Sequence, residues 1–175
     1  MIEFMVIGAP RSGTAWAANF FTTDTSLCLH DPLWQTHYGT LDRFQTVKRF
    51  GIACTGSALF TDWLASHPAP KVILHRESAE IDESLAELGL PPLAPIWRTG
   101  LLNRIDGLHV HWRELFAKPE PIWRHLMREI PFNRERHSLL CALNVQMAFE
   151  RIAINRDAAQ RLFGELAQVA VRSAP

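Results

Sequence analysis

Short segments rich in apolar residues alternate with segments of helical periodicity along most of the chain. The first of them, residues 3–7, is an almost uninterrupted apolar run, which is typical of a strand covered on both faces. Further strands are expected at 26–29, 52–55, 71–75 and 108–112. Because the segments between them have helical character, the pattern predicts an α/β fold of three layers, with a central parallel β-sheet flanked by helices.

Helices are expected where apolar residues recur at intervals of three or four. The expected helices cover 13–21, 41–50, 60–65, 79–88, 96–105, 121–130 and the segment from 133 to 143. Asn133 is placed to cap the last of these, and the apolar stripe that continues to Val171 predicts a helical C-terminus. Residues 31–40 are polar and aromatic and are expected to form a loop at the active edge. No internal repeat interrupts residues 1–175, so a single domain is expected.

Charge and composition narrow the classes of partner. The 175 residues include 18 basic and 18 acidic residues, so the chain has no net positive charge to attract a long nucleic acid. A small anion, by contrast, needs only a local basic cluster. The sequence starts without a basic, apolar leader and has no run near the roughly 20 apolar residues that span a bilayer. A cytoplasmic protein without nucleic-acid or membrane partners is expected.

The cysteines indicate a reducing compartment. Cys28, Cys54 and Cys141 are odd in number, far apart and free of any Cys-x-x-Cys spacing. This arrangement argues against a disulfide framework and against a zinc knuckle. We therefore expect the three cysteines to be small core residues.

Residues 8–14 form the most informative local pattern. They read Gly-Ala-Pro-Arg-Ser-Gly-Thr, directly after a predicted strand and directly before a predicted helix. A strand-loop-helix turn directs several backbone N–H groups and the positive end of a helix at one point, which favours an anion. The loop keeps the Gly-x-x-x-x-Gly frame of a P-loop, but Thr14 and Ala15 stand where Lys and Ser or Thr should follow. Arg11, inside the loop, supplies the basic group instead. The alternative to an anion site is that residues 8–14 are a purely structural turn.

This segment resembles the 5′-phosphosulfate loop of sulfotransferases, usually Pro-(Lys/Arg)-Ser-Gly-Thr-Thr-Trp. The matching residues are Pro10, Arg11, Ser12, Gly13, Thr14, Ala15 and Trp16. The family uses 3′-phosphoadenosine 5′-phosphosulfate (PAPS) as the sulfuryl donor. The resemblance implies that Arg11 grips the 5′-phosphosulfate, that Ser12, Gly13 and Thr14 add hydrogen-bond donors, and that Trp16 stacks on the adenine. Ala15 departs from the pattern by the loss of one hydroxyl.

A second segment resembles the 3′-phosphate motif of the same family. The predicted strand 71–75 is followed by Arg76, and Ser84 comes eight residues later on the next predicted helix. Arg76 leaves the carboxyl end of a parallel strand, which is the edge where ligands of such sheets collect. The usual Asp-Pro after the arginine is replaced here by Glu77 and Ser78. By this resemblance Arg76 and Ser84 bind the 3′-phosphate.

Transfer to a hydroxyl also needs a group that takes the acceptor's proton. Residues 29–34 read Leu-His-Asp-Pro-Leu-Trp and resemble the Tyr-Glu-Pro-Leu-Trp segment of carbohydrate sulfotransferases. The resemblance places Asp31 at the glutamate position and implies that it is the base, with His30 or His37 as alternatives. A turn residue before proline is the structural alternative for Asp31. The histidine that many cytosolic members carry before the 3′-phosphate motif has no counterpart within 54–57.

Two further features concern a possible metal site and the remaining contacts of the 3′-phosphate. His109 and His111 form a His-x-His pair, but no third ligand is nearby in the sequence, so they are expected to be strand side chains and no metal is required. His75, within a predicted strand, is expected to be a core histidine. The family's C-terminal Arg-Lys-Gly clamp on the 3′-phosphate has no clear match, and Arg134 or Arg136 are the candidates to replace it.

Together the motifs predict a sulfotransferase with a P-loop nucleotide-binding fold. It is expected to transfer a sulfuryl group from PAPS to a hydroxyl or amine of a small molecule or carbohydrate, releasing 3′,5′-adenosine bisphosphate. Acceptor recognition is expected from the segment 34–38 and from the proline-rich stretch near Trp97. Two alternatives remain open, a P-loop nucleotide kinase and a catalytically silent nucleotide-binding relative. A homodimer is also left open.

Overall fold

The computed structural model describes residues 1–143, 146–148 and 151–153. The chain divides into two compact units, Met1–Phe132 and Asn133–Pro175. The first unit holds all the site residues expected from the sequence except Arg134 and Arg136. The organisation as a single domain stays a prediction.

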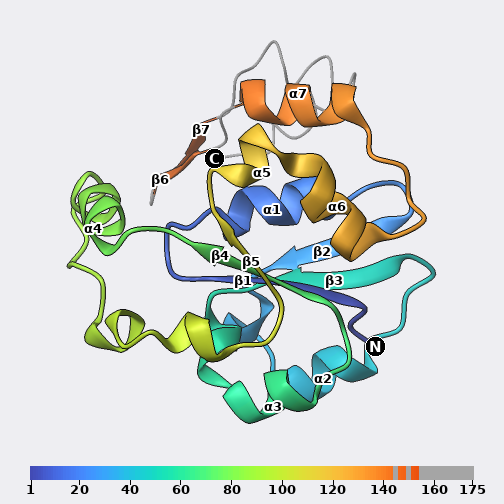
Figure 1. Cartoon of the computed structure of the whole chain (residues 1–175), viewed down its shortest axis with the longest axis horizontal. Coiled ribbons are helices and arrows are strands. Elements are labelled where there is room, and N and C mark those ends of the chain that lie inside the picture. The colour runs from blue at the N-terminus through green and yellow to red at the C-terminus, as the bar shows by residue number, and fades with distance from the viewer. Residues whose placement is uncertain (144–145, 149–150, 154–175) are drawn as a thin grey trace. The chain divides into compact units, whose positions relative to one another are not determined.

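The first unit is built on five parallel strands in the order β2-β3-β1-β4-β5 (Figure 1). The strands are β1 (Phe4–Gly8), β2 (Ser26–His30), β3 (Arg49–Ala53), β4 (Lys71–His75) and β5 (Leu108–His111). The expected α/β class with a central parallel sheet is confirmed. Because β1 lies in the middle of the sheet, the residues that follow it reach the centre of one sheet edge.

Strand β1 is buried along its whole length, which explains its nearly continuous apolar sequence. Its side chains alternate between the two faces. Phe4 contacts the ring of Phe21 in α1, with centroids 5.8 Å apart, whereas Met5 and Ile7 belong to the core on the opposite face. The sheet therefore separates two apolar layers.

Helices cover both faces of the sheet (Figure 1). One face carries α1 (Thr14–Phe21), α5 (Glu114–Ala117) and α6 (Pro119–Met127), and the other carries α2 (Tyr38–Arg43) and α3 (Thr61–Ser66). Aromatic rings fill the first layer, where Phe21 stacks on Trp123 of α6 with centroids 5.6 Å apart. Helix α4 (Ser78–Ala86) follows directly on β4, and its residues Ile81 and Leu85 pack into the core of the second layer.

Two expected helices differ from the structure. Residues 41–50 are not one helix, because α2 ends at Arg43 and the chain enters β3 at Arg49. Residues 96–105 form two 3₁₀ helices, Pro95–Arg98 and Leu101–Arg104, separated by Gly100 with φ +73°. A left-handed glycine ends a helix, which explains the interruption.

Short helical turns occupy the loops at the carboxyl ends of two strands. Part of the expected loop 31–40 is the 3₁₀ helix Pro32–Trp34, and Tyr38 already begins α2. The second of these loops, after β3, contains the 3₁₀ helix Gly56–Leu59. Within the described residues no helix has the length and apolar character needed to cross a membrane.

The second unit begins with α7 (Arg134–Leu143). The Asn133 Oδ1 atom accepts a hydrogen bond from the backbone N–H of Arg136 at 2.8 Å, so the expected N-terminal cap is confirmed. Two short antiparallel strands follow, β6 (Gln146–Ala148) and β7 (Arg151–Ala153). The expected helical tail is wrong for these six residues, and its remainder to Val171 lies outside the described residues.

Candidate functional site

The loop between β1 and α1 has the backbone conformation of an anion-binding turn. Arg11 has φ +63° and Gly13 has φ +90°, and both lie in the left-handed region. Left-handed residues next to residues of other conformation can turn neighbouring backbone N–H groups toward one side, and the first N–H groups of α1 have no partner within the helix. At Gly13 a Cβ atom would lie 3.3 Å from Leu115 Cδ1, so the loop also packs tightly against α5.

Arg11, Ser84 and Arg76 meet at the end of this loop. The Arg11 Nε–H donates to Ser84 Oγ at 3.0 Å, and the Arg76 Nη1–H donates to the backbone carbonyl of Arg11 at 2.6 Å. Burial, and then the positive charge of Arg76, lower the pKa of Arg11. Two guanidinium groups that repel each other at one point provide a field that favours a polyvalent anion.

Arg76 is held in place by its own surroundings. Its Nε–H donates to Glu80 Oε2 at 3.3 Å, and its guanidinium carbon lies 4.5 Å from the ring centroid of Trp112. Glu80 also accepts hydrogen bonds from Trp112 Nε1 at 3.1 Å and from Arg113 Nη2 at 2.6 Å. The bond from Trp112 is the main cause that lowers the Glu80 pKa, followed by the charges of the two arginines. Glu80 therefore stays ionised and orients Arg76.

Sequence reasoning missed both of these partners. The Arg76–Glu80 spacing of four residues is a signal for an ion pair at the start of a helix and could have been found. Trp112 lies at the end of β5, and only the pairing of β5 with β4 brings it to Arg76.

The topology explains why these residues converge. β1 and β4 are neighbours in the sheet, but the chain leaves β1 toward β2 and leaves β4 in the other direction, toward β5. The carboxyl ends of two such strands form a switch point, where loops diverge and ligands of open α/β sheets bind. Arg11 follows β1 and Arg76 follows β4, so both lie at this point.

Ser12 has a buried hydroxyl within the same loop. Its side chain is fully buried, and its Oγ atom has no hydrogen-bond partner among the described residues. Buried hydroxyl groups are usually satisfied, because burial without a partner costs free energy. The neighbouring loop residues Pro10 and Ala15 are partly exposed at the same edge.

The expected base candidates lie beside the loop. The His30 Nε2 atom is 3.4 Å from Thr14 Oγ1 and 3.2 Å from Asp31 Oδ2. Asp31 has φ +44°, and its Oδ1 atom accepts the backbone N–H of Thr55 at 2.6 Å. Both carboxylate oxygens therefore have a partner. Oδ1 accepts from Thr55 in the loop after β3, and Oδ2 contacts His30. The structure links Thr14, His30 and Asp31 in one chain of contacts.

A thiol also approaches Asp31 but is not activated. Burial, followed by the charge of Asp31, raises the pKa of Cys54 to about 11. Burial raises the pKa of Cys28 as well. Both residues are buried, as expected, and their thiols stay protonated at neutral pH. Cys141 is only partly buried, so the expectation of a core residue is wrong there.

Trp16 packs within the aromatic layer. Its side chain is 9% exposed, and its ring lies 4.9 Å from Phe20 and 4.7 Å from Phe116, centroid to centroid. A stacked adenine would have to replace one of these neighbours, and Phe116 is the more exposed of the two.

His37, the other base alternative, accepts the N–H of Gly39 through Nδ1 at 3.1 Å and so caps α2.

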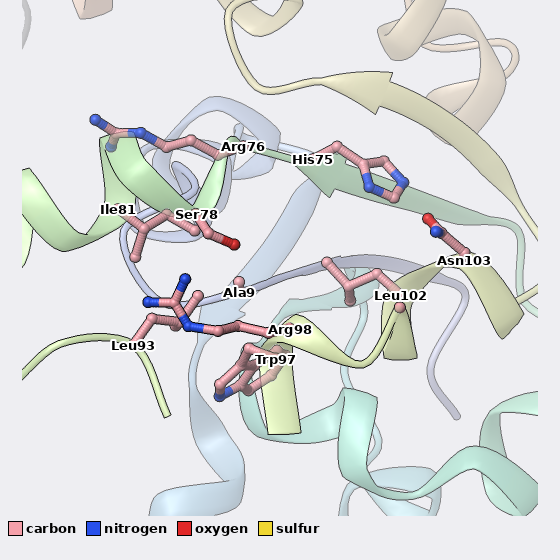
Figure 2. Close-up of a pocket in the computed structure, with 11 residues that line it drawn as sticks. Ala9, His75, Arg76, Ser78, Ile81, Leu93, Trp97, Arg98, Leu102 and Asn103 are labelled. Carbon is pink, nitrogen blue, oxygen red and sulfur yellow. The ribbon is translucent and has the colours of Figure 1, made fainter. Parts of the chain in front are cut away.

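A pocket of about 190 Å³ opens next to the loop, at the carboxyl end of β4 (Figure 2). Its polar lining comes from His75, Arg76, Ser78, Arg98 and Asn103, and its apolar lining from Ala9, Ile81, Leu93, Trp97 and Leu102. We call it the β4 pocket. His75 is half-buried here rather than enclosed in the core, and Trp97 lies in the proline-rich stretch expected to contact an acceptor.

Among the described residues, no group of three or more His, Cys, Asp or Glu side chains has the arrangement of a metal site. Comparisons with protein-family models, with curated proteins and with solved structures find no match for this chain.

Proposed function

We propose that the loop 8–14 is a phosphate-binding P-loop and that the protein is a PAPS-dependent sulfotransferase. The observation that carries the proposal is the meeting of Arg11, Ser84 and Arg76 at the switch point between β1 and β4. The two sequence segments that resemble the 5′-phosphosulfate and 3′-phosphate motifs are 65 residues apart at their arginines, and they are adjacent in space. A donor with phosphate groups at both ends of a ribose needs such a pair of sites.

The charges of the cluster suit the donor's chemistry. As the sulfur leaves the 5′-phosphate, negative charge builds on the bridging oxygen, and positioned cations or N–H groups stabilise that charge. In the proposal Arg11 and the N–H groups of the loop act there, with Ser12 Oγ as a further donor. Arg76 and Ser84 bind the 3′-phosphate, and Glu80 and Trp112 keep Arg76 in a fixed orientation.

The acceptor hydroxyl must also lose a proton. Two groups that can accept this proton border the loop. They are the His30–Asp31 pair on the β2 side and His75 on the β4 side. In the first, Asp31 fixes the imidazole and His30 contacts Thr14. A small molecule or sugar with a hydroxyl or amine is the expected acceptor.

Ligand-induced stabilisation tests the donor site. Thermal unfolding is measured with 3′,5′-adenosine bisphosphate and, separately, with ATP and Mg²⁺. A ligand at 100 times its Kd adds about 2.7 kcal/mol, which raises the Tm of a chain of this size by roughly 5–10 °C. We expect this rise with the bisphosphate, and we expect Arg11→Ala and Arg76→Ala to lose most of it. Arg104→Ala, an exposed arginine outside the cluster, is the matched control.

Each alternative has its own outcome. Stabilisation by ATP and Mg²⁺ but not by the bisphosphate would favour a nucleotide kinase. Stabilisation by the bisphosphate without transfer of labelled sulfate from PAPS to any acceptor would favour a catalytically silent relative. No stabilisation by either nucleotide would refute the donor site.

A further inference from the structure

The β4 pocket has the composition of a binding site for a small anion with a ring. Two arginines, Arg76 and Arg98, line it, and no carboxylate does. Arg98 is paired with Asp82 at the rim, and Arg76 points from the end of β4 (Figure 2). Trp97, Ile81 and Leu93 supply apolar walls. Arg76 is paired as well, with Glu80, but the Nε and Nη1 donors of Arg98 make no hydrogen bond among the described residues. Such free cationic donors favour a negatively charged ligand, and an indole face accepts a flat ring.

The hydrogen bonds of the neighbouring strand determine the tautomer of His75. His109 Nε2 lies 2.8 Å from the backbone carbonyl of Ile105, which can only accept, so Nε2 carries the proton. The Nδ1 atom of neutral His109 is therefore an acceptor, and His75 Nε2, 2.8 Å away, must donate to it. It follows that Nδ1 of neutral His75 carries a lone pair, and this atom makes no hydrogen bond among the described residues.

His75 is also kept neutral. Burial, and then the nearby His109 and His111 of β5, lower its pKa below the ordinary value of 6.5. Arg76 and Arg98, which line the same pocket, are further cations that disfavour a protonated imidazole. At pH 7 the His75 ring is an uncharged proton acceptor, which is the state that a general base needs.

We propose that the β4 pocket binds the sulfuryl acceptor, that this acceptor is a small ring compound carrying both a hydroxyl and a carboxylate, and that His75 takes the proton of its hydroxyl. The inference rests on the proposed function. The carboxylate pairs with Arg98, and the hydroxyl donates to Nδ1 of His75, which lies on the opposite side of the pocket (Figure 2). Asn103, beside His75, is a second polar partner for the hydroxyl.

The chemical step is a single displacement. The acceptor oxygen forms a bond to the sulfur of PAPS while the bond from sulfur to the 5′-phosphate oxygen breaks. The proton moves from the acceptor hydroxyl to His75 Nδ1, and the bridging electron pair leaves with 3′,5′-adenosine bisphosphate. Ala9, the first residue after β1, lines the pocket, so an acceptor there adjoins the proposed site of the phosphosulfate. His109 is a positioning residue, because it acts only through the tautomer of His75.

Three related probes test the pocket without the need for turnover. NMR titrations of the full chain follow the Trp97 indole N–H and the His75 ring with 4-hydroxybenzoate, with benzoate and with phenol. We expect 4-hydroxybenzoate to bind about tenfold more tightly than benzoate, which lacks the hydroxyl. We expect 4-hydroxybenzoate to bind only about threefold more tightly than phenol, which lacks the carboxylate. The difference is small because Arg98 is exposed and ion pairs at exposed sites are weak. Absence of shifts at Trp97 and His75 would overturn the proposal.

Two variants assign the partners. His75→Gln retains a donor toward His109 but has no atom in place of Nδ1, so it should remove the advantage of 4-hydroxybenzoate over benzoate. Arg98→Gln should remove the advantage over phenol. His125→Gln, on α6 and outside the pocket lining, is the control that should leave both ratios within about twofold. Ratios unchanged in His75→Gln would overturn the role of that histidine.

The pH dependence adds a readout that a purely structural histidine would not change. Affinity for 4-hydroxybenzoate should be constant from pH 7 to about 8, before the phenol ionises, and should fall at lower pH as His75 is protonated below its lowered pKa. The bisphosphate stabilisation described above is measured in the same variants. If the bisphosphate still stabilises the protein while the pocket probes fail to bind, the acceptor inference is wrong and the donor site stands. If the bisphosphate does not stabilise the wild type, the proposed function is wrong, and the acceptor inference is wrong with it.

Discussion

Arg76 shows how single side chains prepare the candidate site before a ligand is present. Its charge is balanced by Glu80, its flat face lies on Trp112, and one N–H holds the backbone of Arg11. Side chains that are already oriented lose little conformational entropy on binding, so less of the interaction energy is spent on ordering them.

A second cluster shows a structural role for ionisable residues. Asp42 of α2 accepts hydrogen bonds from Trp63 Nε1 at 3.1 Å and from His67 Nε2 at 3.0 Å. His67 Nδ1 accepts the backbone N–H of Ala69, so Nε2 carries the proton and donates even in the neutral ring. This cluster joins α2 to α3 on the face of the sheet opposite α1.

Replacement of Asp42 by Ala should destabilise the protein by about 2 kcal/mol, because two buried or half-buried donors would lose their acceptor. Urea unfolding measures the change. Asp24→Ala, at an exposed turn, is the matched control and should alter stability by no more than about 0.5 kcal/mol. Equal effects of the two substitutions would show that the cluster contributes nothing beyond its surface charge.

At the scale of elements, β3 depends on a close approach between neighbouring strands. Gly51 pairs with Phe4 of β1, and a Cβ atom at Gly51 would lie only 2.3 Å from the Phe4 ring. Phe4 is fully buried and also contacts Phe21, so a shift of its ring would disturb the packing of the aromatic layer. The glycine is therefore required by packing and not by its backbone conformation.

We expect Gly51→Ala to destabilise the protein by about 1–3 kcal/mol through overpacking of this contact. Gly56→Ala is the control, because a Cβ atom there would meet its nearest neighbours at 3.9 Å, an ordinary contact distance. Chemical denaturation of the two variants side by side measures the difference. A loss at Gly51 no larger than at Gly56 would mean that the Phe4 ring adapts.

For the whole molecule, the balance of charge sets how the proposed donor is attracted. The chain has no net charge, so long-range attraction of a polyanion must come from the local cluster of Arg11 and Arg76. Affinity for 3′,5′-adenosine bisphosphate should fall several-fold between 50 and 500 mM NaCl, as the screening length drops well below about 10 Å. Isothermal titration of wild type and Arg11→Ala should give a steeper salt dependence for the wild type. Equal slopes would place the nucleotide away from Arg11.

The helices and strands differed in how well the sequence predicted them. Strands β1 and β4 were predicted within one residue, because an uninterrupted apolar run has few alternatives in a sheet covered on both faces. The segment 41–50 was predicted as one helix, yet Arg49 and Phe50 belong to β3. Their partners are β1 and β2, which are distant in sequence, so local periodicity carried no signal of the pairing.

Short-range patterns of burial and turn chemistry were enough to predict the class of the sheet and the turn after β1, because they encode these features locally. Arg11, Arg76 and Ser84 were singled out by motif resemblance, and their role as a binding site stays a prediction. Three features became visible only in the folded chain: Ser84 contacts Arg11, Glu80 and Trp112 hold Arg76, and His75 borders a pocket. These contacts join residues of different elements. They depend on the strand order, which the crossover connections establish and which no local pattern records.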